Sequence, residues 1–235
     1  MRPLFVDVHS HVVPSGDDGV DTVGEGRELC HEAGRRGTRL LFATPHVWPH
    51  FPLDPEREQA VRTAYAELLQ GAELELRLGF ELTPSRWLLD EDFRRYELDR
   101  TGAVLIEVPF AGPADLFFAC AERAEASGLR VIAAHPDRTE CVLEDPQIAR
   151  EIAARGWLVQ VNSSSLLGRD GRAIEELGWR FLEDGTASLV ASDGHRRTRP
   201  PYLDEAYALA EERLGGGALP LFDGSALGLA EAAAA

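Results

Sequence analysis

Histidine and carboxylate side chains recur in this 235-residue chain directly after short apolar runs. Neutral imidazole nitrogen and carboxylate oxygen are ligands that suit zinc, iron and manganese. One His-x-His pair alone is weak evidence, because such a pair on a strand can simply face solvent, but five of the seven histidines follow such runs. So many carboxylates also allow bridging, which predicts a cluster of metal ions. The nine predicted ligands are His9, His11, Asp18, His46, Glu81, Glu107, His135, Asp193 and His195.

The apolar runs alternate with helical patterns, which predicts parallel strands joined by helices. The seven runs, rich in valine, isoleucine and leucine, are Leu4–Val8, Leu40–Ala43, Leu74–Phe80, Ala103–Val108, Arg130–Ala134, Trp157–Val161 and Ala187–Ala191. The helical patterns are Val23–Arg36, Pro55–Leu69, Ala114–Ser127, Pro146–Arg155, Arg172–Glu183 and Tyr202–Leu214. In a parallel β/α barrel the carboxyl ends of the strands meet on one face, so the predicted ligands should be neighbours in space.

Local signals support three of these helices. Pro55 and Pro146 each follow an aspartate, as expected of a first helical residue after an N-cap, and Gly128 follows its helix as a C′ glycine would. The sequence shows no repeat, long linker or composition shift before the glycines at 215–217. We expect one domain over residues 1–230 and a disordered tail over residues 231–235.

The composition argues against several classes of protein. The formal net charge is −16, and so acidic a surface repels phosphate backbones, which disfavours nucleic-acid binding. No apolar run approaches the length of a membrane span, and the first ten residues lack the apolar stretch of a signal peptide, so we expect a cytoplasmic protein without membrane insertion. Cys30, Cys120 and Cys141 form no C-x-x-C pair, which predicts reduced thiols.

Several stretches together resemble the PHP superfamily, named for polymerase and histidinol phosphatase domains. They are DVHSHVVPSGDDG, ATPH, GFE, HPDR, QVNSSSLLG and SDGHRRTRPP. Within it, the DDG loop and the RPP element make the chain most similar to the bacterial manganese-dependent protein tyrosine phosphatases of capsule and exopolysaccharide systems. The resemblance implies an α/β fold, a distorted TIM-like (β/α)7 barrel. It also implies three divalent metal ions, with manganese expected and zinc or iron as alternatives.

The same resemblance implies how the ligands are divided among the ions. One ion would be held by His9, His11, Glu81 and Asp193. A second would share Glu81 and add Glu107 and His135. The third would be held by Asp18, His46 and His195. Arg138 and Arg199 match arginines that hold the substrate phosphate, although Arg199 lies one residue nearer the last histidine than in relatives, so Arg197 or Arg196 could take its place.

The expected activity is that of a metal-dependent phosphomonoesterase, namely a protein-tyrosine phosphatase. We expect a hydroxide held between two metal ions to attack phosphorus in line without a covalent intermediate, and no cysteine to serve as nucleophile in a C-x5-R loop. Trp48, Phe51 and Trp87 are candidate walls for the substrate ring, whereas His31 is expected at the surface and His50 is undecided.

Other activities remain open from the sequence alone. The chain could be a histidinol-phosphate or other small-molecule phosphatase, a phosphodiesterase, or a non-catalytic PHP module that binds a partner. The acidity and the lack of a basic aromatic groove argue against the phosphodiesterase, and the filled ligand positions argue against a degenerate module. The expected partner is a phosphotyrosine protein, with a bacterial tyrosine kinase as the family precedent.

Overall fold

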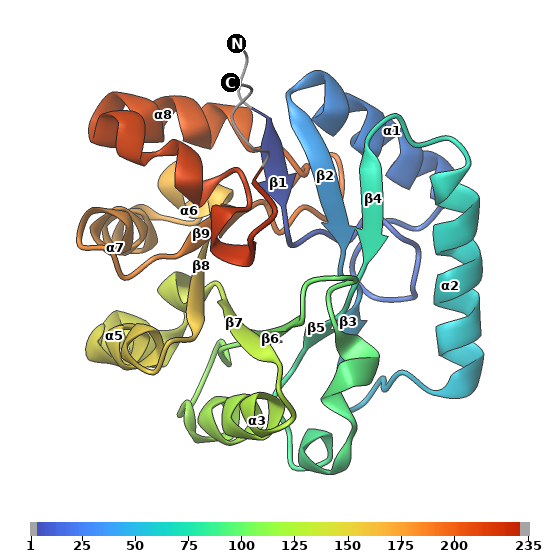
Figure 1. The fold of residues 1–235 in the computed structure, drawn as a ribbon, viewed down its shortest axis with the longest axis horizontal. Helices are drawn as coiled ribbons and strands as arrows, with labels where there is room; N and C mark the ends of the chain where they lie inside the picture. Colours follow the sequence, from blue (N-terminus) through green and yellow to red (C-terminus); the bar gives the residue numbers. More distant parts are fainter. Residues whose placement is uncertain (1–3, 231–235) are drawn as a thin grey trace.

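A computed structural model describes residues 4–230, in which strands and helices alternate along the chain. The strands are β1 (Phe5–Asp7), β2 (Thr38–Ala43), β3 (His46–Val47), β4 (Glu75–Leu78), β5 (Glu81–Leu82), β6 (Ala103–Glu107), β7 (Arg130–Ala134), β8 (Leu158–Asn162) and β9 (Leu189–Ala191). The helices are α1 (Val23–Arg35), α2 (Pro55–Leu69), α3 (Asp115–Ala126), α4 (Glu140–Glu144), α5 (Gln147–Ala154), α6 (Ser163–Leu166), α7 (Arg172–Glu183) and α8 (Asp204–Leu214). Figure 1 shows the helices arranged around the strands.

The strands form two parallel sheets, ordered β1-β2-β4 and β3-β5-β6-β7-β8-β9. The predicted seven strands are present, but two of them are followed by short additional strands, because the chain crosses from the first sheet to the second after β2 and after β4. Pro45 at the first crossing has no N–H to donate to a ladder. At the second, a Cβ on Gly79 would lie 2.3 Å from Leu98 Cδ2, so a side chain would collide there. The barrel is therefore divided into two sheets, and this division is its departure from a closed, continuous barrel.

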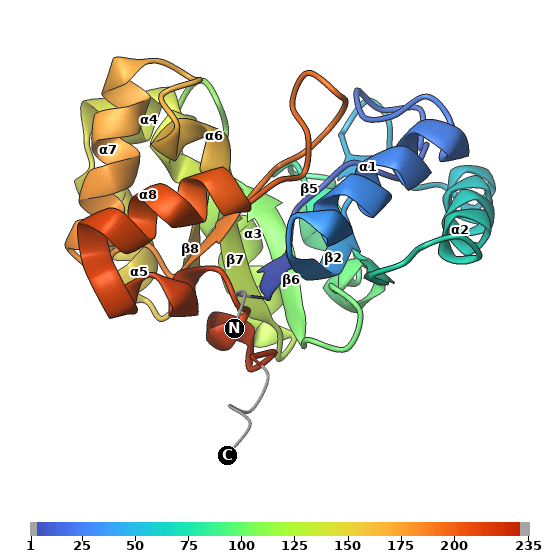
Figure 2. The same ribbon diagram turned by 90° about the horizontal axis from the view of Figure 1, so that it is seen from above.

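The two sheets meet again where the ends of β1 and β9 run together. Ser10 forms a parallel bridge with Gly194, and the His11 amide donates to the Gly194 carbonyl at 2.6 Å. The Asp193 amide likewise donates to the His9 carbonyl at 2.9 Å. Figure 2 shows the orange segment after β9 beside the blue segment after β1. Residues 183 or 184 positions apart are thereby placed on one face of the molecule.

The predicted cap at the start of α2 is confirmed. The Asp54 side chain accepts from the Arg57 amide at 2.8 Å, and Pro55 is the first helical residue. Gly128 follows α3 with φ 83°, the left-handed conformation that glycine adopts without strain. Pro146 lies one residue before α5 rather than within it, so the predicted start of that helix is wrong by one residue.

Within residues 4–230, no helix is both long enough and apolar enough to span a lipid bilayer. The cores of the strands are buried and apolar, and the helices between them cover the outside of the barrel. The tail predicted over residues 231–235 lies outside the described residues.

Candidate metal centre

The structure brings all nine predicted ligands together at the carboxyl ends of the strands. They fall into three groups, and within each group one ligand atom from every residue lies within 4.8 Å of the others. The groups are His9, His11, Glu81 and Asp193; Glu81, Glu107 and His135; and His11, Asp18, His46 and His195. This division matches the predicted one, except that His11 also borders the third group. Eight of the nine residues are buried, and Asp18 alone has an exposed side chain.

In the first group, the ligand atoms of two histidines and two carboxylates lie close to one another. The Nε2 atoms of His9 and His11 lie 3.2 Å apart, and Glu81 Oε2 is 3.0 Å from the first and 3.2 Å from the second. Asp193 Oδ1 completes the set at 3.4 and 3.5 Å. Burial lowers the pKa of each imidazole, but the neighbouring carboxylates outweigh it and raise the pKa of both histidines above the ordinary value. A cation bound here would replace those protons.

The second group contains two carboxylates close enough to repel each other. His135 Nε2 lies 2.9 Å from Glu81 Oε1, and Thr83 donates its hydroxyl proton to Glu107. Burial, followed by the charge of Glu81, raises the pKa of Glu107 to about 8. A bound divalent ion would offset the repulsion between Glu81 and Glu107 and would favour the ionised form of both carboxylates.

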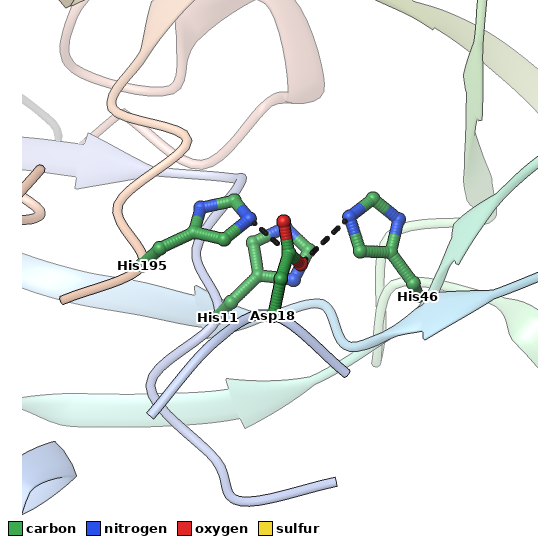
Figure 3. A group of neighbouring side chains, drawn as sticks. All are labelled: His11, Asp18, His46 and His195. Carbon is green, nitrogen blue, oxygen red and sulfur yellow. Dashed lines mark ion pairs between the residues drawn. The ribbon is translucent and has the colours of Figure 1, made fainter. Parts of the chain in front are cut away.

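The third group surrounds Asp18, as Figure 3 shows. Asp18 Oδ1 lies 3.2 Å from His195 Nε2 and 3.5 Å from His46 Nε2. Its pKa is lowered, mainly by the hydrogen bond to His195, while burial lowers the pKa of His195 itself. An ionised carboxylate beside a neutral imidazole is the pairing that metal ions bind.

Buried ligand atoms without a well-oriented hydrogen bond support metal binding at this face. Glu81 Oε2 and His46 Nδ1 lie 3.0 Å apart, and both are buried without a hydrogen-bond partner in suitable geometry among the described residues. Such atoms are rare in folded proteins and call for an explanation such as a bound ion. Although burial opposes ionisation, His46 and His9 hold the pKa of Glu81 well below its usual range. The residues present therefore fit a cluster of divalent transition-metal ions.

Two further side chains orient the ligand histidines. His9 Nδ1 lies 2.9 Å from Gln160 Oε1, and His11 Nδ1 lies 3.4 Å from Asp17 Oδ2. Asp17 also accepts from the His46 amide at 3.0 Å. A carboxylate or amide on the far nitrogen fixes the ring and leaves Nε2 for a metal. The sequence analysis missed both residues, although a glutamine inside an otherwise apolar strand and a second aspartate in the DDG loop are signals for them.

A buried arginine holds the loops that carry Asp18 and His46. Arg57 Nη2 donates to the His46 carbonyl at 2.7 Å, and Nε donates to the Ser15 carbonyl at 3.2 Å. Nη1 donates to the Phe51 carbonyl at 2.8 Å, and the guanidinium carbon lies 3.8 Å from the Phe51 ring centre. Phe51, a predicted substrate wall, therefore packs on Arg57.

Two of the ligand residues have a left-handed backbone. His135 has φ 35° and Asp193 has φ 51°, whereas residues with a Cβ rarely adopt positive φ. His135 follows β7 directly, and Asp193 follows β9 after one intervening residue, at the points where the chain turns and directs these side chains at the cluster. The strained backbone conformation at these two residues is therefore found where the chain positions candidate ligand atoms.

The predicted phosphate-binding arginines lie beside Asp193. Arg138 Nη1 donates to Asp193 Oδ2 at 3.0 Å, and Arg199 Nη1 is 3.7 Å from the same oxygen. Arg199 also contacts His195 Nδ1. Of the alternatives, Arg197 pairs with Glu28 on the exposed surface. Arg196 pairs with Asp21 at 2.5 Å, and its Nε donates to the Asp18 carbonyl at 3.2 Å. Arg199 is the one of these three arginines whose side chain is seen to contact both Asp193 and His195.

Aromatic rings flank the ligand set at both ends. Trp48 stacks between His46 and His50, with ring centres 4.6 and 5.3 Å away. At the opposite end Phe110, which the sequence analysis missed, stacks on His135 at 5.2 Å. These contacts place His50 in the exposed part of the Trp48 stack.

Two other predictions concern side chains away from these rings. Trp87 is 37% exposed, and no contact between it and a ligand residue is seen among the described residues. His31 lies at the surface, as predicted, and its Nδ1 is 2.9 Å from Glu73.

A family model described as capsular polysaccharide synthesis, CpsB/CapC, matches residues 5–220. The chain belongs to the CpsB/CapC family. The tyrosine-protein phosphatase YwqE of Bacillus subtilis is 28% identical to it over 233 residues, covering 90% of this chain and 85% of the relative. The tyrosine-protein phosphatase CpsB of Streptococcus pneumoniae is 26% identical over 227 residues, covering 90% and 91%.

A solved structure has the same fold as this CpsB/CapC chain. It comes from the crystal structures of YwqE from Bacillus subtilis and CpsB from Streptococcus pneumoniae, which are described as metal-dependent tyrosine phosphatases. The TM-score is 0.83 at 24% identity, covering 96% of this chain and 95% of the other. The predicted barrel and the predicted family resemblance are both confirmed.

One cysteine of this CpsB/CapC protein has the C-x5-R spacing of thiolate-based phosphatases. Cys30 and Arg36 are separated by five residues, so the spacing is present, although not in a phosphate-binding loop. Cys30 lies inside α1, and burial raises the pKa of its thiol to about 12. Arg36 Nη1 pairs with Asp204 at 3.1 Å. Burial therefore disfavours a thiolate at this position, and the guanidinium is already paired with a carboxylate.

Proposed function

We propose that this chain is a metal-dependent phosphomonoesterase that hydrolyses phosphotyrosine in proteins. The observation that carries the proposal is the junction of ligands and arginines at Asp193. One of its carboxylate oxygens faces His9 and His11, and the other accepts from Arg138. The candidate metal ligands and the candidate phosphate-binding arginines thus lie side by side, so both could act on one phosphoryl group.

The nine predicted ligands would hold three divalent ions in the three groups described above, with manganese as the proposed metal. When bound, such ions supply positive charge to the phosphoryl oxygens and favour ionisation of water at neutral pH. Glu81 belongs to two of the groups, so its two oxygens can serve neighbouring ions. Gln160 and Asp17 keep the Nε2 atoms of His9 and His11 directed at the cluster.

Arg138 and Arg199 would bind the phosphate group. Each guanidinium presents several N–H donors in a plane, which suits the oxygens of a phosphoryl group and balances the charge that develops on them. Asn162 Nδ2 donates to Asp193 Oδ2 at 2.9 Å, so it helps keep this carboxylate oriented between the arginines and the histidines. No cysteine takes part, in keeping with the burial of Cys30.

An aryl ester suits a site of this kind. The phenolate that leaves phosphotyrosine has a reference pKa of about 10, so it needs less help from a general acid than an alkoxide does. The relatives described above are named tyrosine-protein phosphatases, which supports the same substrate class. We also propose that the substrate is a cytoplasmic phosphotyrosine protein, with a bacterial tyrosine kinase as the first one to test.

The experiment compares metal-stripped protein with protein reloaded with manganese. Both are assayed on a phosphotyrosine peptide and, in parallel, on histidinol phosphate. We expect turnover of the peptide only after reloading, and turnover of the peptide well above that of histidinol phosphate. A preference for histidinol phosphate would identify a small-molecule phosphatase instead. No turnover of either substrate would favour a non-catalytic module.

A matched pair of variants tests whether the cluster carries the activity. His9→Ala removes a ligand of the first group, and we expect the rate to fall by about 100-fold or more. His31→Ala makes the same change at a histidine whose side chain is 51% exposed and contacts only Glu73 among the described residues. This control should keep the wild-type rate. Equal rates for His9→Ala and wild type would contradict the proposed role of the cluster.

A further inference from the structure

Phe110 is an exposed aromatic ring at the edge of a buried polar site. It follows β6, three residues after Glu107, and it is 47% exposed. The nearby ligands Glu107 and His135 are almost fully buried. An exposed ring of this size beside a candidate active site is available to pack against an apolar part of a ligand.

The ring is held by contacts to the site itself. Its centre lies 5.2 Å from that of His135, and the two planes are 20° apart. The guanidinium carbon of Arg138 lies 5.4 Å from the same ring centre. The Phe110 carbonyl also accepts from the Glu140 amide at 3.0 Å, which fixes the backbone at this point. The ring is therefore positioned in advance of any ligand.

Arg138 connects this ring to the place where phosphate would bind. The same guanidinium that borders Phe110 donates to Asp193, the residue shared by the metal ligands and the arginines. In an aryl phosphate a single ester oxygen separates phosphorus from the ring. A phosphate bound by Arg138 would thus bring its own aryl ring against Phe110.

The other aromatic candidate at this face has no comparable free surface. Trp48 is half-buried and stacks with both His46 and His50, at interplanar angles of 26° and 12°. Both partners come from the same short segment of chain. Of these two rings, Phe110 therefore has the larger exposed surface against which the aromatic ring of a ligand could pack.

We propose that Phe110 is the surface on which the phenyl ring of phosphotyrosine packs, and that it determines a preference for aryl over alkyl phosphates. This inference rests on the proposed function. Offset or tilted aromatic pairs add to the free energy of simple burial, so loss of the ring should weaken aryl binding roughly tenfold. An alkyl phosphate has no ring to place there and should bind unchanged.

The test measures binding as well as turnover on manganese-loaded protein. Phenylphosphonate and methylphosphonate are titrated into wild type and into Phe110→Ala, which changes an exposed side chain and should fold normally. We expect the preference for phenylphosphonate to fall roughly tenfold in the variant, and Phe110→Tyr to restore it. In turnover, KM for a phosphotyrosine peptide should rise while kcat changes little. Leu209→Ala, at an exposed apolar residue of α8, is the matched control.

The outcomes separate this inference from the proposed function. If Phe110→Ala leaves the phenyl-to-methyl ratio unchanged, or weakens both phosphonates equally, the aromatic surface is elsewhere and the inference is overturned. If wild type fails to hydrolyse phosphotyrosine but the ratio still falls in the variant, the proposed function is wrong while the role of Phe110 stands. If Leu209→Ala lowers the ratio as much, the effect is not local and the inference also fails.

Discussion

Replacing Asp17 by asparagine should weaken metal binding without unfolding the protein. The side chain is fully buried, and it is in hydrogen-bond contact with two candidate ligand residues. Oδ2 faces His11 Nδ1 and accepts from the His46 amide, while Oδ1 accepts from the Gly19 amide at 3.0 Å. Asparagine has one accepting oxygen in place of two, so an NH2 group must face at least one of these donors.

The expected loss of affinity follows from this geometry. Side chains that orient metal-binding histidines are worth about 10- to 100-fold in metal affinity, or about 1.4–2.8 kcal/mol. Asp17 contacts the ring of His11 and the backbone of His46, and both residues border the third group. We therefore expect the affinity for the manganese ion of the third group to fall by about this much in Asp17→Asn.

The same substitution has a pH signature in the metal-free protein. Burial opposes ionisation of Asp17, but the hydrogen bond and charge of His11, together with the His46 and Gly19 amides, outweigh it and leave the pKa below the ordinary value. A carboxyl with a lowered pKa in the folded state stabilises the protein above its unfolded pKa, and this stabilisation is lost as the pH falls. Asp17→Asn should therefore be less stable than wild type at pH 7, and the difference should shrink below about pH 4.

The assay is calorimetric titration of manganese into metal-stripped protein, with circular dichroism to confirm the fold. Asp99→Asn is the control, because the Asp99 side chain is 49% exposed and pairs with Arg100. The metal affinity of this variant should stay within about twofold of wild type. A folded Asp17→Asn protein with wild-type affinity would refute the reasoning, as would an equal loss in Asp99→Asn.

Three further predictions follow from the site. Arg57→Leu removes the donors of three hydrogen bonds to backbone carbonyls. The free energy of unfolding, measured by chemical denaturation, should fall by about 3–5 kcal/mol. A change below about 1 kcal/mol would contradict the role of these hydrogen bonds. Because the pKa values of His9 and His11 are raised, manganese loading near pH 7 should release protons and weaken as the pH falls, which titration in buffers of different ionisation enthalpy measures. Cys30 should resist iodoacetamide in the native protein, and modification with loss of activity would revive a thiolate mechanism.

Elements with strong local signals were predictable from the sequence. The helix at Pro55–Leu69 agrees to the residue, because Asp54 and Pro55 fix its start through contacts within four residues. The strand at Arg130–Ala134 also agrees, since it is apolar and flanked by turns. The short strands β3 and β5 were not predicted, because they exist only through the pairing of His46 with Glu81, which are far apart in the sequence.

The candidate ligands were predictable for a different reason. The carboxyl ends of parallel strands meet on one face, so a polar residue at such an end can be placed without knowing its neighbours. Other residues at the site are recognised only by their contacts with a candidate ligand, for example the 2.9 Å contact between Gln160 and His9. The same is true of Asp17 and Phe110. Spacing along the chain does not encode such contacts, and only the folded arrangement reveals them.

The left-handed backbone at His135 and Asp193 sets stability against function. Each such residue costs about 1–3 kcal/mol, and glycine or asparagine adopts the same conformation with less strain. At His135, asparagine or glycine would relieve this strain and remove a candidate ligand in one step, so selection for activity and selection for thermal resistance oppose each other there. At Asp193 the carboxylate also accepts from Arg138 and Asn162, so its replacement would leave buried donors unpaired. An inactive homologue with asparagine or glycine at position 135 alone should therefore melt at a higher temperature than its active counterpart in the metal-free form.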